Sequence, residues 1–432
     1  MIVQLINEVL ADGVRCLSLP DSRFKTSRLT AVLLLPLRRE TASACALVPY
    51  LLRRSCAAYP DYTALQRRLN ELYGATISAE VARIGEAQAL VLTAAAIDDR
   101  FALAGEPVAE SCAALLREML FDPVLENGLF RAADVELEKR VLIERMEAEI
   151  NDKRWYARRR CEELLCENEA YAVDRYGTPE AAAALTPESV TAAWKSALTG
   201  ARVQLILQGG AAAMHAAGPL RSALAGVPGR KPLDPKTDTA VAYPPVRERV
   251  ERMDVGGSKL VMGFRTGTAE PDGDVAAARL MNALFGGTPH SLLFQNVREK
   301  LSLCYYCASS YDRLKGILLV DSGVDEQNVE RAKEEILRQL SALQQGAFSD
   351  DEMESARLSA CNSFASVGDS QAAQASWYLG QSLLPAVSTP EEASKALAGV
   401  TRDRIVEAAG RVTLESVFLL AQDHKGEGTA DA

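Results

Sequence analysis

The sequence is poor in histidine. Its 432 residues contain only His215, His290 and His424, so the first 214 residues contain none. Imidazole nitrogen is one of the main protein ligands of zinc, together with thiolate and carboxylate. A histidine-ligated metal site confined to the first half of the chain is therefore excluded, whatever the fold.

The sequence also lacks segments that enter or cross a membrane. Its start has neither the basic region nor the long apolar run of a secretory signal. No run approaches the roughly eighteen apolar residues of a transmembrane helix. Nine scattered cysteines, an odd number, indicate reduced thiols rather than a disulfide framework. We therefore expect a cytoplasmic protein that makes no membrane contact.

The sequence also has no excess of basic over acidic residues. The formal net charge is -10, whereas nucleic-acid-binding proteins normally carry a basic face. With 48% hydrophobic and 25% charged residues, the composition is that of a globular protein long enough for two or three domains. No nucleic-acid partner is expected.

The regular pattern of strands and helices is interrupted once. Residues 228–245, PGRKPLDPKTDTAVAYPP, contain five prolines and mixed charge, as expected for an exposed connection. This predicts a first domain over residues 1–225, a linker over 226–246 and a second domain over 247–432.

The two halves share an order of elements. AAAIDDRF in the first half corresponds to DSGVDEQN in the second, each at a junction between a strand and a helix, and FRAADVELEKR corresponds to FSDDEMESARL. Strands alternate with helices and short hairpins in both halves. The sequence therefore predicts an internal duplication and an α+β fold. In the first half, one unusually long helix is expected from about residue 130 to residue 165.

Residues 41–59, TASACALVPYLLRRSCAAY, predict a helix. Leu47, Leu51 and Leu52 are spaced to share an apolar face. Pro49 interrupts the pattern, because proline removes a backbone donor and crowds the preceding turn. Taken alone, this segment is equally typical of an ordinary core helix.

Residues 285–306 read FGGTPHSLLFQNVREKLSLCYY. They come after a predicted helix and predict, in order, a glycine-rich turn, a second helix and a strand. Cys304 and Cys307 have C-x-x-C spacing. On a regular strand, residues three apart face opposite sides, which suits neither a zinc site nor a redox pair. We therefore expect these cysteines to be structural.

Together these segments resemble the insulinase and pitrilysin superfamily of zinc peptidases, the inverzincins. The H-x-x-E-H motif of that superfamily falls on Ala46, Pro49 and Tyr50, so both histidines and the glutamate are replaced. The third ligand, a glutamate on a later helix, falls on Arg145, beside Glu144. The resemblance implies two homologous repeats, each with an antiparallel-rich sheet packed against helices. It also implies a non-catalytic peptidase homologue with no metal and no cofactor.

The second-half segment resembles the R-E-K-x-x-L-x-Y signature of the same superfamily. Arg298 and Tyr305 occupy the positions that contact peptide substrate and the developing oxyanion, while Leu301 and Ser302 replace the usual Arg-Gly. The resemblance thus implies that Arg298 and Tyr305 bind substrate. Two other interpretations stay open: Arg298 as a cation favoured by the C-terminal end of a helix dipole, and Tyr305 as a packing residue.

The pattern is most similar to a non-catalytic subgroup from Gram-positive bacteria, the elongation factor P 5-aminopentanol modification-associated proteins. This implies pairing with a zinc-bearing insulinase-like paralogue as a heterodimer, or with a second copy as a homodimer, around a chamber for a peptide or protein. The alternative is a scaffold that binds a client protein without proteolysis. An independent metallopeptidase conflicts with the missing ligands.

Overall fold

The structure is a computed structural model that describes residues 5–239 and 245–423. Residues 1–4 of the first predicted domain, residues 424–432 of the second, which include His424, and residues 240–244 of the predicted linker lie outside these ranges. The chain forms two compact units, and neither is continuous in sequence. Unit 1 comprises Met1–Glu147, Val173–Lys236 and Asp369–Leu383, and unit 2 comprises Ala148–Ala172, Thr237–Gly368 and Leu384–Ala432. The predicted boundaries at residues 225 and 247 stay a prediction about the extent of the repeats along the sequence.

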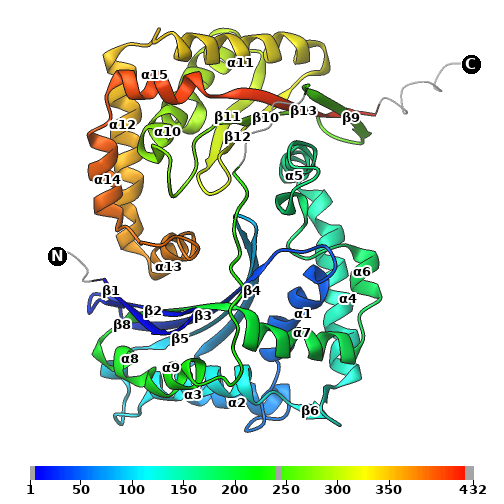
Figure 1. Cartoon of the computed structure of the whole chain (residues 1–432), viewed down its shortest axis with the longest axis vertical. Helices are drawn as coiled ribbons and strands as arrows, with labels where there is room; N and C mark the ends of the chain where they lie inside the picture. Colours follow the sequence, from blue (N-terminus) through cyan, green and yellow to red (C-terminus); the bar gives the residue numbers. More distant parts are fainter. Residues whose placement is uncertain (1–4, 240–244, 424–432) are drawn as a thin grey trace, which may run out of the picture. The chain divides into compact units, whose positions relative to one another are not determined.

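Unit 1 is a six-stranded sheet with helices (Figure 1). Its elements are β1 (Ile6–Ala11), β2 (Val14–Pro20), β3 (Thr26–Pro36), α1 (Ala42–Leu52), α2 (Tyr62–Glu71), β4 (Thr76–Ile84), β5 (Ala87–Ile97), α3 (Val108–Phe121), the short hairpin β6 (Leu125–Glu126) and β7 (Leu129–Phe130), α4 (Ala132–Ala148), α6 (Pro179–Ala183), α7 (Pro187–Gly200), β8 (Arg202–Gly209), α8 (Ala211–Ala216), α9 (Gly218–Ala225) and α13 (Gln371–Leu379).

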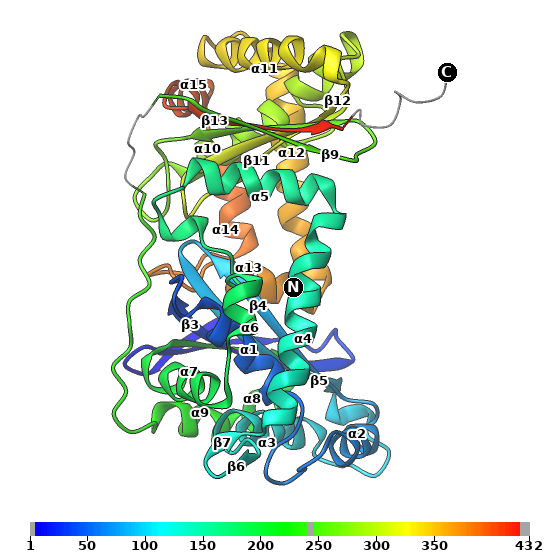
Figure 2. The same cartoon turned by 90° about the vertical axis from the view of Figure 1, so that its right-hand side faces the viewer.

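Unit 2 is a five-stranded sheet with helices (Figure 2). Its elements are α5 (Lys153–Leu165), β9 (Arg247–Met253), β10 (Ser258–Arg265), α10 (Val275–Asn282), β11 (Cys304–Asp312), β12 (Ile317–Val324), α11 (Val329–Gln344), α12 (Asp350–Ala365), α14 (Pro390–Ala398), α15 (Arg402–Gly410) and β13 (Thr413–Gln422). Two π-helical segments, Ala283–Gly287 and Phe294–Lys300, lie between α10 and β11.

The two sheets have the same topology. The strand order is β1-β2-β8-β3-β5-β4 in unit 1 and β11-β12-β10-β13-β9 in unit 2. In unit 1, β3 pairs antiparallel with β5 and β8, and β8 pairs parallel with β2; in unit 2, β10 pairs antiparallel with β12 and β13, and β13 pairs parallel with β9. Apart from β1, each strand of one sheet has a counterpart in the other. The predicted α+β fold with two antiparallel-rich repeats is therefore confirmed.

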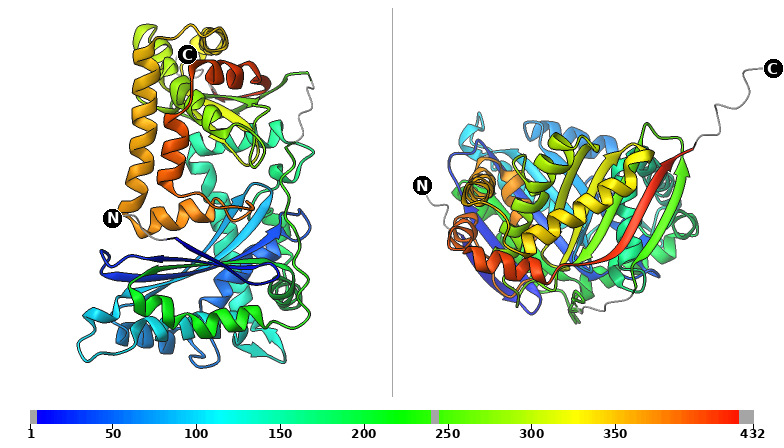
Figure 3. Two further views of the ribbon diagram at one scale, coloured as in Figure 1. Left: turned by 60° about the vertical axis from the view of Figure 1, so that its left-hand side comes forward. Right: turned by 90° about the horizontal axis from the view of Figure 1, so that it is seen from above.

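Each half of the chain supplies one helix to the unit formed mainly by the other half. α5, from the first half, packs against β10 and β13, on the face of that sheet opposite α11, as Figure 2 shows. α13, from the second half, packs against β8, opposite α3, α8 and α9 (Figure 3). In unit 1, the Gln208 side chain donates to the backbone carbonyl of Gln371, at 2.8 Å, and to the side chain of Gln374, at 3.0 Å. Both sheets are thus covered on two faces.

Burial explains why the central strands are apolar on both sides. Seven consecutive residues of β3 and all of β12 are buried. One face of the unit 2 sheet packs on α10, α11 and α15, and the other packs on Ala157, Cys161 and Leu165 of α5. A strand covered on both faces reads as a continuous hydrophobic run rather than an alternating one.

The single long helix predicted over residues 130–165 is wrong. α4 ends at Ala148, a short 3₁₀ turn follows, and α5 begins at Lys153. The Asp152 carboxylate accepts a hydrogen bond from the backbone N–H of Trp155, at 2.9 Å. This cap starts a new helix, and the break allows α5 to belong to unit 2 while α4 belongs to unit 1.

A buried ionic cluster holds the segment after α5 in unit 2. The Glu169 carboxylate pairs with Arg265 of β10 and with Lys315, whose side chain is completely buried. Arg265 also pairs with Glu415 of β13, at 3.3 Å. The hydroxyl of Tyr171 donates to Asp312, at 2.8 Å. The connection that carries the chain back to unit 1 is therefore fixed by charge as well as by apolar packing.

Candidate functional site

The helix α1 carries the positions that correspond to the metal-binding motif. Ala46, Pro49 and Tyr50 are all buried, and the helix continues through the proline to Leu52. None of the three side chains offers a group that commonly binds zinc. The helix is thus retained as a packing element of unit 1 without the chemistry of the motif.

Tyr50 lies in a cluster of aromatic and cationic side chains. The Arg145 guanidinium carbon is 4.5 Å from the centroid of the Tyr50 ring and 6.0 Å from that of Tyr176. Arg53 stands 5.6 Å from the Tyr50 ring, and Arg175 stands 4.3 Å from the Tyr176 ring. Such guanidinium–ring contacts are attractive because the ring face is electronegative. We call these five residues the Arg/Tyr cluster.

The position of Arg145 agrees with the alignment of the third ligand. Arg145 on α4 contacts Tyr50 on α1, as a third ligand would face a second, whereas the neighbouring Glu144 is exposed. Burial raises the pKa of the Tyr50 hydroxyl, and hydrogen bonding with Tyr176 raises it further, so Tyr50 stays protonated at neutral pH. The site therefore places guanidinium groups and a neutral phenol where the family binds a cation.

These residues do not fit zinc. A cationic guanidinium next to the second ligand position would repel Zn²⁺, and Ala46 and Pro49 supply no donor atom. Among the residues that the structure describes, no group of three histidine, cysteine or acidic side chains is arranged to hold a metal ion.

The two predicted substrate-binding residues line one cavity. Arg298 lies on the π-helical segment Phe294–Lys300, and Tyr305 lies at the start of β11. The cavity has a volume of about 370 Å³ and is lined by Arg298, Glu299, Ser302, Leu303, Cys304, Tyr305 and Asp325. We call it the Arg298 cavity. It combines a cation, two carboxylates and an aromatic ring at the surface of unit 2.

The contacts of Arg298 leave its guanidinium accessible. Its Nε lies 3.6 Å from the Glu299 carboxylate, its guanidinium carbon is 4.7 Å from the Phe294 ring, and its side chain is 41% exposed. The guanidinium group itself stacks on the Phe294 ring, and the residue lines the cavity. Arg298 also lies in the last turn of this segment, as the alternative of a cation at a helix end predicts.

Tyr305 and Tyr306 differ in their surroundings. Tyr305 is 64% exposed, and its hydroxyl donates to Asp325, at 3.0 Å. Tyr306 instead packs under the Arg154 guanidinium, 4.4 Å from its ring centroid. The exposure of Tyr305 favours a contact with another molecule over a packing role.

The turn before Tyr305 survives the departure from the family pattern. Ser302 has a φ of 49°, in the left-handed region that glycine adopts without a steric penalty. Its backbone N–H donates to the carbonyl of Arg298, at 3.1 Å. A turn between Arg298 and Tyr305 therefore forms with serine at the position where the resemblance predicts glycine.

The expectation that Cys304 and Cys307 face opposite sides of the sheet is wrong. The register between β11 and β12 shifts between Cys304 and Tyr306, so Tyr305 is an extra residue in a β-bulge. Cys304 lies opposite Val324 and Cys307 lies opposite Ser322. Because residues 322 and 324 are two apart on β12, they face the same side, and so do both cysteines.

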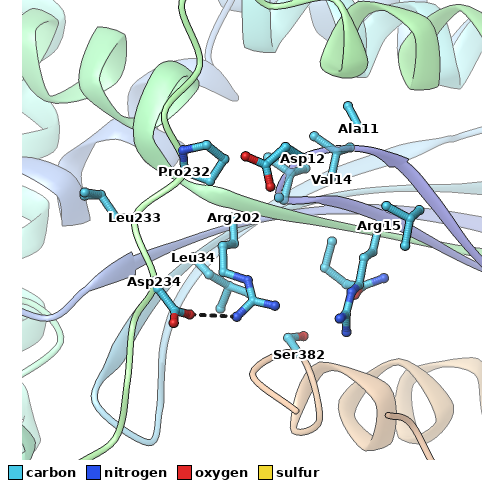
Figure 4. Close-up of a pocket in the computed structure, with 14 residues that line it drawn as sticks. Ala11, Asp12, Val14, Arg15, Leu34, Arg202, Pro232, Leu233, Asp234 and Ser382 are labelled. Atoms are coloured by element: carbon cyan, nitrogen blue, oxygen red, sulfur yellow. Dashed lines mark hydrogen bonds and ion pairs between the residues drawn. The ribbon is translucent and has the colours of Figure 1, made fainter. Parts of the chain in front are cut away.

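A second cavity, of about 440 Å³, lies at the edge of the unit 1 sheet (Figure 4). Arg15 and Arg202 both end near Ser382, and burial together with the charge of Arg202 lowers the pKa of Arg15. Arg202 pairs with Asp234, at 3.1 Å. Since the charge of Arg202 is already compensated by Asp234, we do not place substrate binding in this cavity.

Sequence reasoning missed most of the Arg/Tyr cluster. Arg53 follows Tyr50 by three residues on a helical segment, so its proximity could have been read from spacing. Tyr176 reaches Tyr50 from a loop, with Arg175 over the Tyr176 ring, and no local pattern indicates these contacts. Asp325 in the Arg298 cavity follows β12, and its pairing with Tyr305 likewise depends on the register of the sheet.

A duplicated α+β fold whose helix α1 lacks the metal ligands is the arrangement expected of a non-catalytic homologue of the M16-type peptidases. The profile of the family described as "Peptidase M16 inactive domain" matches residues 184–359. The "Probable inactive metalloprotease YmfF" of Bacillus subtilis (strain 168) is 30% identical over 405 residues, which cover 92% of this chain and 93% of that protein. The chain belongs to the M16 peptidase family as a non-catalytic homologue.

Solved structures share the fold. A conserved protein from Enterococcus faecalis V583 has a TM-score of 0.85 at 27% identity and covers 97% of this chain and 99% of its own. An M16 inactive domain from Pseudomonas fluorescens has a TM-score of 0.77 at 16% identity, with 97% and 98% covered. A protease from Helicobacter pylori has a TM-score of 0.79 at 13% identity, with 98% and 100% covered. The last two similarities concern the fold alone.

Proposed function

We propose that the chain is the non-catalytic subunit of a two-chain peptidase, and that its partner is a zinc-bearing insulinase-like paralogue. The partner would supply the metal, its bound water and the general base. This chain would supply part of the wall of a chamber that holds a peptide. Two observations together carry the proposal: the metal ligands are replaced at α1 and at Arg145, and Arg298 and Tyr305 line one open cavity.

The Arg298 cavity suits a peptide backbone. An arginine presents several N–H donors in a fixed fork, which can bind a carbonyl or a carboxylate, and Tyr305 offers an exposed ring beside it. In the proposed pair, Arg298 would stabilise the substrate carbonyl as it gains negative charge. One such donor contributes about 3 kcal/mol. The exposed position of the Arg298 side chain agrees with a contact to a substrate in the chamber rather than to another residue of this chain.

We further propose that the pair acts in the cytoplasm and in the modification of elongation factor P. The support for the cytoplasm is that all nine cysteines are free, as in a reducing compartment. No helix within the described part of the chain is long and apolar enough to cross a bilayer. The link to elongation factor P rests on the resemblance to the subgroup named above, and no residue of the site specifies that substrate.

The first test is capture of the chain from its native cell extract, with zinc and peptidase activity measured on the recovered complex. We expect a stoichiometric paralogue with H-x-x-E-H, and activity that neither chain has alone. Recovery of the chain by itself, or with a modification enzyme and no zinc, would instead support a scaffold that binds a client protein. The dismantled metal site is equally compatible with that second candidate.

Replacing Arg298 by alanine should lower the turnover of the reconstituted pair by roughly 100-fold, because one charge-stabilising donor is lost. Assembly of the pair, measured by light scattering, should not change. The matched control is Arg331→Ala, which removes an exposed arginine from α11 of the same unit. Equal turnover for Arg298→Ala and Arg331→Ala would remove Arg298 from the substrate site.

A further inference from the structure

The bulge at Tyr305 places two cysteines on one face of unit 2. Cys304 and Cys307 both pack against the apolar core that lies between the sheet and α10 and α11. Cys304 is partly exposed and lines the Arg298 cavity, whereas Cys307 is 4% exposed beneath the surface. One thiol is therefore accessible from the cavity, and a second thiol lies behind it.

The position of β11 permits local movement around these thiols. β11 is an edge strand, paired only with β12. The bulge already breaks the regular pairing next to Cys304. Closing a disulfide requires the two β-carbons to lie about 3.8 Å apart. A bulged edge segment can adjust to this spacing more easily than a central strand can, because fewer backbone hydrogen bonds hold it.

The electrostatic surroundings activate the accessible thiol. Hydrogen bonding with Cys307 lowers the pKa of Cys304 to about 7; burial opposes this effect, while Ser322 and the charge of Arg298 assist it. Burial instead raises the pKa of six other cysteines, which are Cys16, Cys45, Cys56, Cys112, Cys161 and Cys166. At neutral pH a large fraction of Cys304 is thus the nucleophilic thiolate.

We propose that Cys304 and Cys307 form a reversible redox pair that is oxidised by small-molecule disulfides. The Cys304 thiolate attacks one sulfur of the oxidant, breaks its S–S bond and releases one thiolate, which leaves a mixed disulfide on Cys304. The Cys307 thiol then loses its proton and attacks the Cys304 sulfur, and the second half of the oxidant leaves. Two protein thiols lose two electrons, one small disulfide becomes two thiols, and these take up the two protons.

The pair would control the Arg298 cavity, and this part of the inference rests on the proposed function. Tyr305 lies between the two cysteines in the chain, and Cys304 lines the same cavity as Arg298. A disulfide would tighten the bulge and move the Tyr305 ring. We therefore expect oxidation to weaken peptide binding and reduction to restore it.

The chemical test uses the reduced full-length chain and oxidised glutathione at pH 7, with the products mapped by mass spectrometry under non-reducing conditions. We expect one Cys304–Cys307 disulfide per chain. Cys307→Ser should stop at a glutathione mixed disulfide on Cys304, and Cys304→Ser should leave Cys307 unmodified. Cys361→Ser, which removes the other partly exposed cysteine, should change nothing. Circular dichroism verifies that each variant is folded.

A second measurement follows alkylation of Cys304 by iodoacetamide against pH. The rate should be half-maximal near pH 7, and at that pH roughly tenfold faster than for a thiol of ordinary pKa near 8.5. A stable mixed disulfide on the native chain, or oxidation shared equally with Cys361, would overturn the redox pair. If the disulfide forms but peptide affinity is unchanged, the control of the cavity is rejected. If the reduced chain with its partner binds no peptide, the proposed function fails while the redox pair stands.

Discussion

A chain with Ala46→His, Tyr50→His and Arg145→Glu should bind one zinc ion, whereas the native chain should retain none after dialysis. Positions 46 and 50 are four apart on α1 and share one face. Position 145 faces position 50, because the Arg145 guanidinium carbon is 4.5 Å from the Tyr50 ring. Two imidazoles and a carboxylate are a common ligand set for zinc. We expect binding tighter than roughly micromolar, since structural zinc sites contribute about 10 kcal/mol or more.

The matched control variant keeps Arg145. The double variant Ala46→His and Tyr50→His should bind zinc at least about 100-fold more weakly, because it lacks one ligand and retains a cation beside the site. Both variants would be measured by elemental analysis and by competition with a chelator. If the triple variant is folded and binds no zinc, positions 46, 50 and 145 do not converge as the alignment requires.

The second large effect is a loss of stability, expected when the ionic cluster of Glu169, Arg265, Lys315 and Glu415 is broken. Glu169→Ala should lower the free energy of unfolding of unit 2 by about 3–5 kcal/mol, as for other buried pairs that lose one partner. Arg265 and Lys315 are nearly or completely buried, so both would lose a carboxylate that solvent cannot easily replace. The measurement is urea unfolding, together with hydrogen exchange of α5, because two units can unfold separately.

Glu167→Ala serves as the comparison. Its carboxylate is 54% exposed and pairs with Arg247, at 3.4 Å. A surface pair of this kind contributes about 0–1 kcal/mol. Similar losses for Glu169→Ala and Glu167→Ala would mean that the cluster is not essential for holding α5 against β10 and β13.

Much of the fold could be predicted, because its elements are marked by local patterns. The strands around Leu33 and Leu92 are continuous apolar runs, and Asp61 caps the helix that follows it, with its carboxylate 2.8 Å from the backbone N–H of Ala64. The exchange of α5 and α13 could not be predicted. A helix's apolar face indicates that the helix is covered, but it does not specify which sheet covers it.

The candidate site could likewise be predicted only in part from the sequence. The loss of the metal ligands at Ala46, Pro49 and Tyr50 was visible in the sequence. The contact between Tyr50 and Tyr176 was not, because it depends on how distant segments pack. Cys304 and Cys307 share a face of the sheet because of a single bulge. One inserted residue moves every later side chain of a strand to the opposite face. A period of two read along the sequence cannot detect such an insertion.

The exchanged helices also constrain how the protein folds as it leaves the ribosome. Once residue 236 has been synthesised, every strand of the unit 1 sheet exists, but α13, which packs on β8, does not. At that stage α5 carries the apolar surface of Ala157, Cys161 and Leu165 with no sheet to cover it. Unit 1 cannot complete its core until α13, which ends at Leu379, has been synthesised, and unit 2 cannot do so until β13, which ends at Gln422, has been synthesised. Nascent chains arrested in the linker should therefore expose two apolar surfaces and recruit chaperones, and release of full-length chains should end that association.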